Sequence, residues 1–133
     1  MIVVDSSALI AILFDEPERQ EFEAVIASGE ACVMSAVNAH ETVSVLRVRH
    51  GPAAVERFWR FMAVCEIEIV PFDEAQVRVA AAAFDQYGKR IHPRARLNLS
   101  DCAAYALAKS RNAPLLFKGN DFTHTNLQSA LPV

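Results

Sequence analysis

The stretch "LNLSDCAAYALAKSRNAPLLFKG", residues 97–119, decides the fold that the sequence predicts. It begins with polar residues typical of helix N-termini and continues as an alanine-rich run of helical composition. It ends in the short apolar segment "PLLFK", which is typical of a buried strand. A helix that leads into a buried strand belongs to a unit in which helices connect parallel strands, so we expect the same alternation elsewhere in the chain.

The remainder of the chain repeats this alternation. Short apolar or alternating runs predict strands at "MIVV" (1–4), "ACVMSA" (31–36) and "EIEIVPF" (66–72). Segments of helical composition lie at "SSALIAILF" (6–14), "SAVNAHETVSVLRVRHG" (35–51), "PAAVERFWRFMAVC" (52–65) and "DEAQVRVAAAAFDQYG" (73–88). We therefore expect residues 1–133 to form a single domain of the α/β class, a three-layer α/β/α fold with a mainly parallel central sheet.

The composition limits the classes of function. Hydrophobic residues make up 53% of the 133 residues, which is enough to bury a core. The formal net charge is −3, so binding to a nucleic acid requires a local basic patch or a bound metal. Scattered cysteines and an apolar start without a basic leader favour a cytoplasmic protein with no membrane segment. The zinc-protease motif, the P-loop and the glycine-rich dinucleotide motif are all missing from the sequence.

Four acidic residues follow the predicted strands. Asp5 comes directly after the first strand, and Asp121 comes shortly after the last one. Glu41 and Asp101 lie early in helices that begin at the same edge of the sheet. Carboxylates that converge repel one another unless a cation joins them, and Mg²⁺ or Mn²⁺ prefers such oxygen ligands. The spacing alone does not decide between roles, but the placement of all four acids at strand ends favours a divalent-metal site built from them.

Each acid also has a purely structural interpretation, which the sequence leaves open. Asp5 and Asp101 are well placed to cap their helices, the latter together with Asn98. Glu41 fits a solvated helix position, and Asp121 fits a turn.

Three stretches match the motifs of one known family. They are "IVVDSSALIAILFDEPE" (2–18), "SAVNAHETVSVL" (35–46) and "HPRARLNLSDCAAYALAKSRNAPLLFKGNDFTHT" (92–125). In these motifs the chain resembles the PIN-domain ribonucleases, specifically the VapC-type toxins of bacterial toxin–antitoxin pairs, over nearly its whole length. The resemblance implies a compact fold with a parallel sheet and an endoribonuclease that uses Mg²⁺ or Mn²⁺ to hydrolyse RNA phosphodiester bonds.

The resemblance also assigns roles to particular residues. Asp5, Glu41, Asp101 and Asp121 would be the catalytic, metal-binding acids. Among them we expect Asp5 and Asp101 to be direct ligands, and Glu41 and Asp121 to bind through water or to hold a second metal. Ser6 matches a small hydroxyl position that would orient a carboxylate, although it equally suits a helix cap. Asn126 stands where the family often has a further acid, so it would act through hydrogen bonds and without charge.

Substrate and partners form the last set of expectations. The basic segment "KRIHPRAR" (89–96) would bind RNA phosphates through Lys89, Arg90, Arg94 and Arg96, unless it is only a solvated connector. The resemblance implies a homodimer and a VapB-like antitoxin that inhibits the toxin by placing a basic side chain near the acids. Aromatic side chains in "VERFWRFMAVC" (55–65) suit either the core or such a partner.

Two other functions compete with this assignment. A dehalogenase-like phosphotransfer enzyme would use Asp5 as its nucleophile, but it needs a second Asp where Ser7 stands. The alternative of a non-catalytic PIN-fold RNA-binding or interaction module is disfavoured by the presence of all four acids.

Overall fold

The computed structural model describes residues 1–131 and contains one four-stranded sheet in that range. Its strands are β1 (Ile2–Val4), β2 (Cys32–Ser35), β3 (Glu68–Val70) and β4 (Leu115–Leu116), in the spatial order β3-β2-β1-β4. All three pairings are parallel. The last two residues of the expected domain, 132 and 133, lie outside the described part, and the single-domain boundary stays a prediction.

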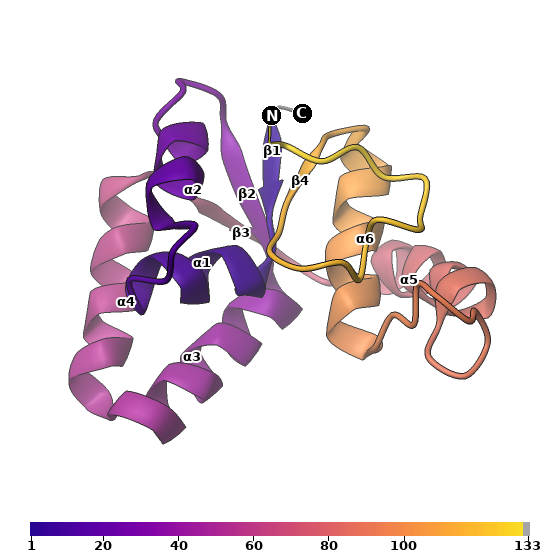
Figure 1. The fold of residues 1–133 in the computed structure, drawn as a ribbon, viewed down its shortest axis with the longest axis horizontal. Helices are drawn as coiled ribbons and strands as arrows, with labels where there is room; N and C mark the ends of the chain where they lie inside the picture. The colour runs from indigo at the N-terminus through magenta and orange to yellow at the C-terminus, as the bar shows by residue number, and fades with distance from the viewer. Residues whose placement is uncertain (132–133) are drawn as a thin grey trace.

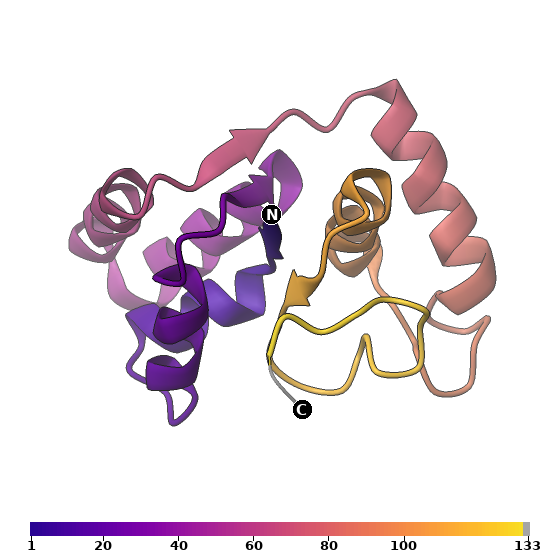
Figure 2. The same cartoon turned by 90° about the horizontal axis from the view of Figure 1, so that it is seen from above.

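Helices cover both faces of the sheet, which confirms the three-layer α/β/α class (Figures 1 and 2). One face carries α1 (Ser6–Leu13), α2 (Arg19–Ile26), α3 (Ala36–His50) and α4 (Pro52–Val64). The other face carries α5 (Glu74–Tyr87) and α6 (Leu99–Arg111). None of the helices in the described part of the chain combines the length and apolar character that crossing a membrane requires.

Alternation along the strands divides the core in two. Ile2 and Val4 of β1 pack beneath α1–α4, whereas Val3 between them packs beneath α6. Successive side chains of a strand point to opposite faces, so a strand covered on both faces must be apolar at every position. The run "MIVV" is fully buried after its first residue for this reason. Because it is apolar on both faces, this short strand can lie in the interior of the sheet, between β2 and β4.

The strand order reverses beside β1. The chain steps from β1 to β2 and β3 in one direction, and β4 then pairs with the opposite side of β1. Pairing continues one residue past β1, where the Asp5 amide donates to the Leu116 carbonyl at 2.9 Å. In open α/β sheets, ligands bind beyond the carboxyl ends of the strands at such a reversal. The topology therefore places Asp5 and the segment after β4 side by side at the position of a binding site.

Candidate active site at the carboxyl ends of the strands

The four predicted acids, Asp5, Glu41, Asp101 and Asp121, line one pocket of about 210 Å³ at this edge of the sheet. A volume of that size holds several water molecules. The acids come from the end of β1, from α3, from the first turn of α6 and from the segment after β4. The structure thus brings together residues spread over most of the sequence.

Asp5 is both a helix cap and a buried pocket residue. Its Oδ2 accepts hydrogen bonds from the Ser7 amide at 3.1 Å and from the Ser7 hydroxyl at 2.5 Å, which caps α1. Its Oδ1 is buried without a hydrogen-bond partner among the described residues. Burial raises the pKa of Asp5 to about 6 against the lowering effect of the Ser7 bonds, and the charge of Glu41 raises it further. An unpartnered buried carboxylate oxygen is costly unless a ligand satisfies it.

Asp101 combines the same two roles. With Asn98 it forms a capping box, in which the Asn98 amide donates to Asp101 Oδ2 at 3.0 Å and the Asp101 amide donates to Asn98 Oδ1 at 2.8 Å. Burial is the largest cause that raises its pKa to about 7, against the Asn98 bond, and the charges of Asp5, Asp121 and Glu41 add to it. Capping therefore occupies one oxygen of the carboxylate, Oδ2, while the charges of three neighbouring acids act on the group.

Glu41 is held between two hydroxyl groups. Ser6 donates a short hydrogen bond to Oε1, and Ser100 donates to Oε2 at 2.8 Å. Ser6 therefore makes the carboxylate contact expected of it, although the carboxylate is that of Glu41 and not that of neighbouring Asp5. A carboxylate oxygen accepts more than one hydrogen bond, so each oxygen of Glu41 retains capacity toward the pocket.

The two predicted residues near the C-terminus, Asp121 and Asn126, lie in different environments. Asp121 is exposed on the segment after β4 and lines the pocket. Asn126 is not among the lining residues; its Oδ1 accepts a hydrogen bond from the Tyr105 hydroxyl at 2.6 Å, which ties the C-terminal segment to α6. The structure therefore gives Asn126 a packing role and does not place it with the acids.

Sequence reasoning missed several polar residues of the pocket. Ser7 and Ser100 bond the acids directly, and Asn38 lies buried beneath Ser100. Arg49 and Lys118 line the pocket as well, and the Lys118 ammonium pairs with Glu16 at 2.9 Å and with Glu18 at 3.2 Å. The only signal for the serines was their position next to acids in "DSS" and "LSD", which capping explained equally well.

The basic segment 89–96 is an exposed loop that joins α5 to the residue before the α6 cap. Arg90 and Arg96 adopt positive φ angles of 75° and 54°. His92 fixes the loop, because its Nδ1 accepts hydrogen bonds from the backbone amides of Arg94 and Ala95 at 3.1 and 2.9 Å. None of its four cationic side chains lines the carboxylate pocket. The loop therefore lies next to the Asp101 helix along the chain, outside the acidic centre.

The side chains of the pocket fit a small divalent cation that keeps much of its water. The carboxylates and hydroxyls that line the pocket offer oxygen ligands, and the unpartnered Asp5 Oδ1 could supply one direct contact. Within residues 1–131, however, no three His, Cys, Asp or Glu side chains are close enough to hold one ion together. Mg²⁺ is usually bound by one or two carboxylates, with water completing its shell, so this spacing suits Mg²⁺ better than a metal enclosed by protein ligands.

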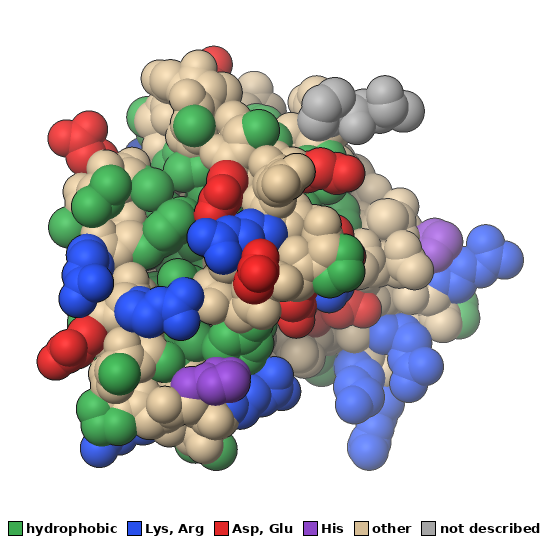
Figure 3. Space-filling view, turned by 60° about the vertical axis from the view of Figure 1, so that its left-hand side comes forward, with side chains coloured by type: hydrophobic (Ala, Val, Ile, Leu, Met, Phe, Trp, Pro, Cys, Tyr) green, Lys and Arg blue, Asp and Glu red, His purple; other side chains and the backbone are tan. Residues whose placement is uncertain are grey.

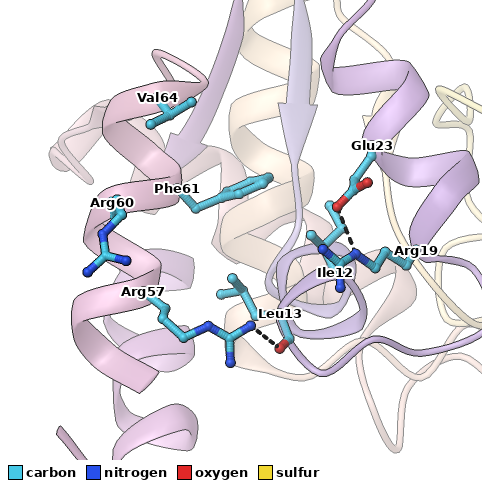
Figure 4. A pocket seen from close by; sticks show the side chains of 8 residues that line it. All are labelled: Ile12, Leu13, Arg19, Glu23, Arg57, Arg60, Phe61 and Val64. Carbon is cyan, nitrogen blue, oxygen red and sulfur yellow. Dashed lines mark hydrogen bonds and ion pairs between the residues drawn. The ribbon is translucent and has the colours of Figure 1, made fainter. Parts of the chain in front are cut away.

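A groove also lies on the face that carries α1, α2 and α4 (Figure 4). Its floor is apolar, with Ile12, Leu13 and Phe61, and arginines stand around it; Arg57 donates to the Leu13 carbonyl at 3.1 Å. The space-filling view shows apolar side chains on this side of the molecule, with basic and acidic side chains interspersed among them (Figure 3). The aromatic residues of α4 differ in burial, because Phe58 lies in the core whereas Trp59 is 50% exposed.

Comparison with known proteins agrees with this architecture. The family model "PIN domain" matches residues 2–127. Ribonuclease VapC30 of Mycobacterium tuberculosis is 39% identical over 132 residues, which covers 98% of this chain and all of the relative. Ribonuclease VapC of Mycolicibacterium smegmatis is 38% identical over 126 residues, covering 95% and 97% of the two chains. The crystal structure of M. tuberculosis VapC20, described as a Sarcin-Ricin loop cleaving toxin, superposes with a TM-score of 0.81 at 16% identity over 99% of this chain and all of that one.

The fold and the site together define a class of protein. Its members are parallel α/β sandwiches with an acidic pocket at the point where the strand order reverses. The chain belongs to the PIN domain family. Its full-length curated relatives are VapC proteins, which confirms the resemblance seen in the sequence motifs.

Proposed function

We propose that the protein is a metal-dependent endoribonuclease toxin of a toxin–antitoxin pair. The observation that carries the proposal is the buried, unpartnered Asp5 Oδ1 in a pocket shared with three further carboxylates. Clustering acids in this way raises their pKa values and costs stability, so a ligand that needs them is the physical reason to keep them together. The relatives named VapC ribonucleases support the choice of RNA as substrate.

Each acid has a part in the proposed mechanism. Asp5 and Asp101 each have one oxygen bonded at a helix cap, and the other oxygen of each would hold Mg²⁺ or Mn²⁺. The hydroxyls of Ser6 and Ser100 hold Glu41 in place. Glu41 and Asp121 would bind the cation through water, or hold a second metal. When bound, the cation would offset phosphate charge and lower the pKa of a nucleophilic water.

The direct test is cleavage of a structured RNA by the purified protein in Mg²⁺ or Mn²⁺, compared with Asp5→Ala and with excess EDTA. We expect the substitution and the chelator each to lower the cleavage rate by about a hundredfold or more, because even indirect metal contacts contribute tenfold to a hundredfold. Equal rates in all three samples would refute the proposal and favour the non-catalytic module. Formation of a covalent aspartyl intermediate would instead favour the dehalogenase-like alternative.

The basic loop is proposed to hold the RNA backbone beside the carboxylates. We expect the triple variant Arg90→Ala, Arg94→Ala, Arg96→Ala to bind RNA more weakly and to reduce the slope of log affinity against log salt by up to about 2, since each lost contact with a single strand contributes about 0.7. Binding of a fluorescent RNA by the Asp5→Ala protein across salt concentrations measures the slope. The matched control removes Lys109 and Arg111, which are exposed at the other end of α6. An unchanged slope in the triple variant would remove the loop from the binding surface.

The partner is proposed to be a VapB-like antitoxin that inhibits cleavage by placing a basic side chain in the carboxylate pocket. A solved structure of similar fold, titled "Toxin-antitoxin complex from Klebsiella pneumoniae", has a TM-score of 0.69 and supports such a partner. FitAcB from Neisseria gonorrhoeae has a similar fold, with a TM-score of 0.71. Both are below 20% identical to this chain, so their likeness to it is one of fold alone. The homodimer, the Mg²⁺ or Mn²⁺ cofactor and the cytoplasmic location all stay predictions.

A further inference from the structure

The hydrogen bonds around Glu41 connect elements that are distant in the sequence. Glu41 Oε2 accepts from the hydroxyl of Ser100, 59 residues further along the chain, at 2.8 Å. Ser100 lies in the first turn of α6, directly before Asp101. The contact therefore links Glu41 on α3 to the residue that directly precedes Asp101 on α6.

A buried side chain, Asn38, bonds the backbone of Ser100. It lies on α3 one turn before Glu41, is 1% exposed, and donates from Nδ2 to the Ser100 carbonyl at 3.0 Å. The same Nδ2 is 3.5 Å from the Ser6 hydroxyl, which is the other donor to Glu41. The backbone and the hydroxyl of Ser100 are therefore both bonded to α3, so the first turns of α1 and α6 are fixed relative to Glu41.

The Ser100 hydroxyl has a second acceptor within reach. Its Oγ lies 3.0 Å from Asn98 Oδ1, which already accepts the Asp101 amide. A hydroxyl has one proton, so it donates to Glu41 or to Asn98 but not to both at once. Removing the hydroxyl leaves the Asn98 cap paired with its amide. We therefore expect Ser100→Ala to fold with its α6 cap intact.

We infer that Ser100, supported by Asn38, is a positioning residue that sets the separation between the Glu41 and Asp101 carboxylates and so tunes their affinity for a divalent cation. The inference rests on the proposed function for its biological meaning, and on the hydrogen bonds of α3 and α6 for its geometry. Residues that hold a ligating carboxylate in place typically change metal affinity tenfold to a hundredfold when removed.

The first experiment needs no metal and no RNA. Urea unfolding of the wild type, Ser100→Ala, Glu41→Ala and the double variant, all in EDTA, forms a double-mutant cycle. We expect the effect of Ser100→Ala on the unfolding equilibrium constant to change at least about twofold when Glu41 is already removed. Additive effects would overturn the inference.

The second experiment measures Mn²⁺ binding calorimetrically without RNA. We expect Ser100→Ala to weaken binding about tenfold, Ser100→Thr to restore it because the hydroxyl is kept, and Ser110→Ala to leave it unchanged. Ser110 is the matched control on the same helix, where its hydroxyl donates to the Ala106 carbonyl at 2.7 Å. Wild-type affinity in Ser100→Ala, or an equal loss in Ser110→Ala, would contradict the inference. Failure of the wild type to cleave RNA would refute only the proposed function, because neither experiment depends on cleavage.

Discussion

Asp101→Asn is expected to lower RNA cleavage by about a hundredfold or more and, in the absence of metal, to raise the melting temperature by about 2–4 °C. The two effects have opposite signs for one reason. The Asp101 carboxylate is raised to a pKa of about 7 by burial and by the charges of Asp5, Asp121 and Glu41, so its ionised form destabilises the metal-free fold. Asparagine keeps the acceptor that the Asn98 amide needs but carries no charge toward the pocket.

The control for this prediction is Asp85→Asn, which removes an exposed carboxylate from α5, away from the pocket. It is expected to leave both the cleavage rate and the melting temperature unchanged. Thermal unfolding in EDTA and a cleavage assay in Mn²⁺ provide the two readouts. A melting temperature that falls in Asp101→Asn would show that the carboxylate serves mainly as a cap, and that the repulsion among the acids is weak.

The stability of the metal-free protein is expected to fall as the pH rises from about 4 to about 7. The pKa values of Asp5 and Asp101 in the folded chain are about 6 and about 7, against an ordinary value of 3.8. In this window the folded state retains protons that the unfolded state has released, so the free energy of unfolding decreases with increasing pH. Urea unfolding at pH 5 and pH 8 in EDTA measures this decrease.

Saturating Mn²⁺ is expected to reverse the trend, because metal binding requires both carboxylates to be deprotonated and therefore strengthens with pH. The Asp101→Asn variant supplies the control, because it lacks the carboxyl group whose pKa is raised most. In EDTA its free energy of unfolding should decrease less with rising pH than that of the wild type. Equal pH dependence in wild type and variant would contradict the assigned pKa of Asp101.

Most of the fold was predictable because its signals are local. "MIVV" predicts a buried strand from its side chains alone, and Asn98 marks the start of α6 because the capping box needs only residues within one turn. The structure shortens the expected strands "EIEIVPF" to Glu68–Val70 and "PLLFK" to Leu115–Leu116. Pairing with a neighbouring strand defines those ends, and the sequence does not contain that information.

The convergence of the four acids was also predictable, because residues that follow parallel strands share one edge of the sheet. The sequence left capping and metal binding open for Asp5. For Asp101 it allowed both roles, with Asn98 as the cap and the whole Asp101 carboxylate free for metal. The structure shows that one carboxylate oxygen caps the helix while the other remains for the pocket. A carboxylate has two oxygens, and only three-dimensional placement tells which way each of them points.

The sequence by itself thus determined the layers of the fold, the edge that carries the site and the acids that line it. The tertiary structure alone decided that the Ser100 hydroxyl reaches Glu41 and that Asn38 bonds the Ser100 carbonyl. It also decided that Asn126 bonds Tyr105 away from the acids. Helix and strand signals arise from periodicity over a few residues, whereas these contacts depend on how closely α3 and α6 approach across the end of the sheet. That distance is set by the packing of the whole core and by no single motif.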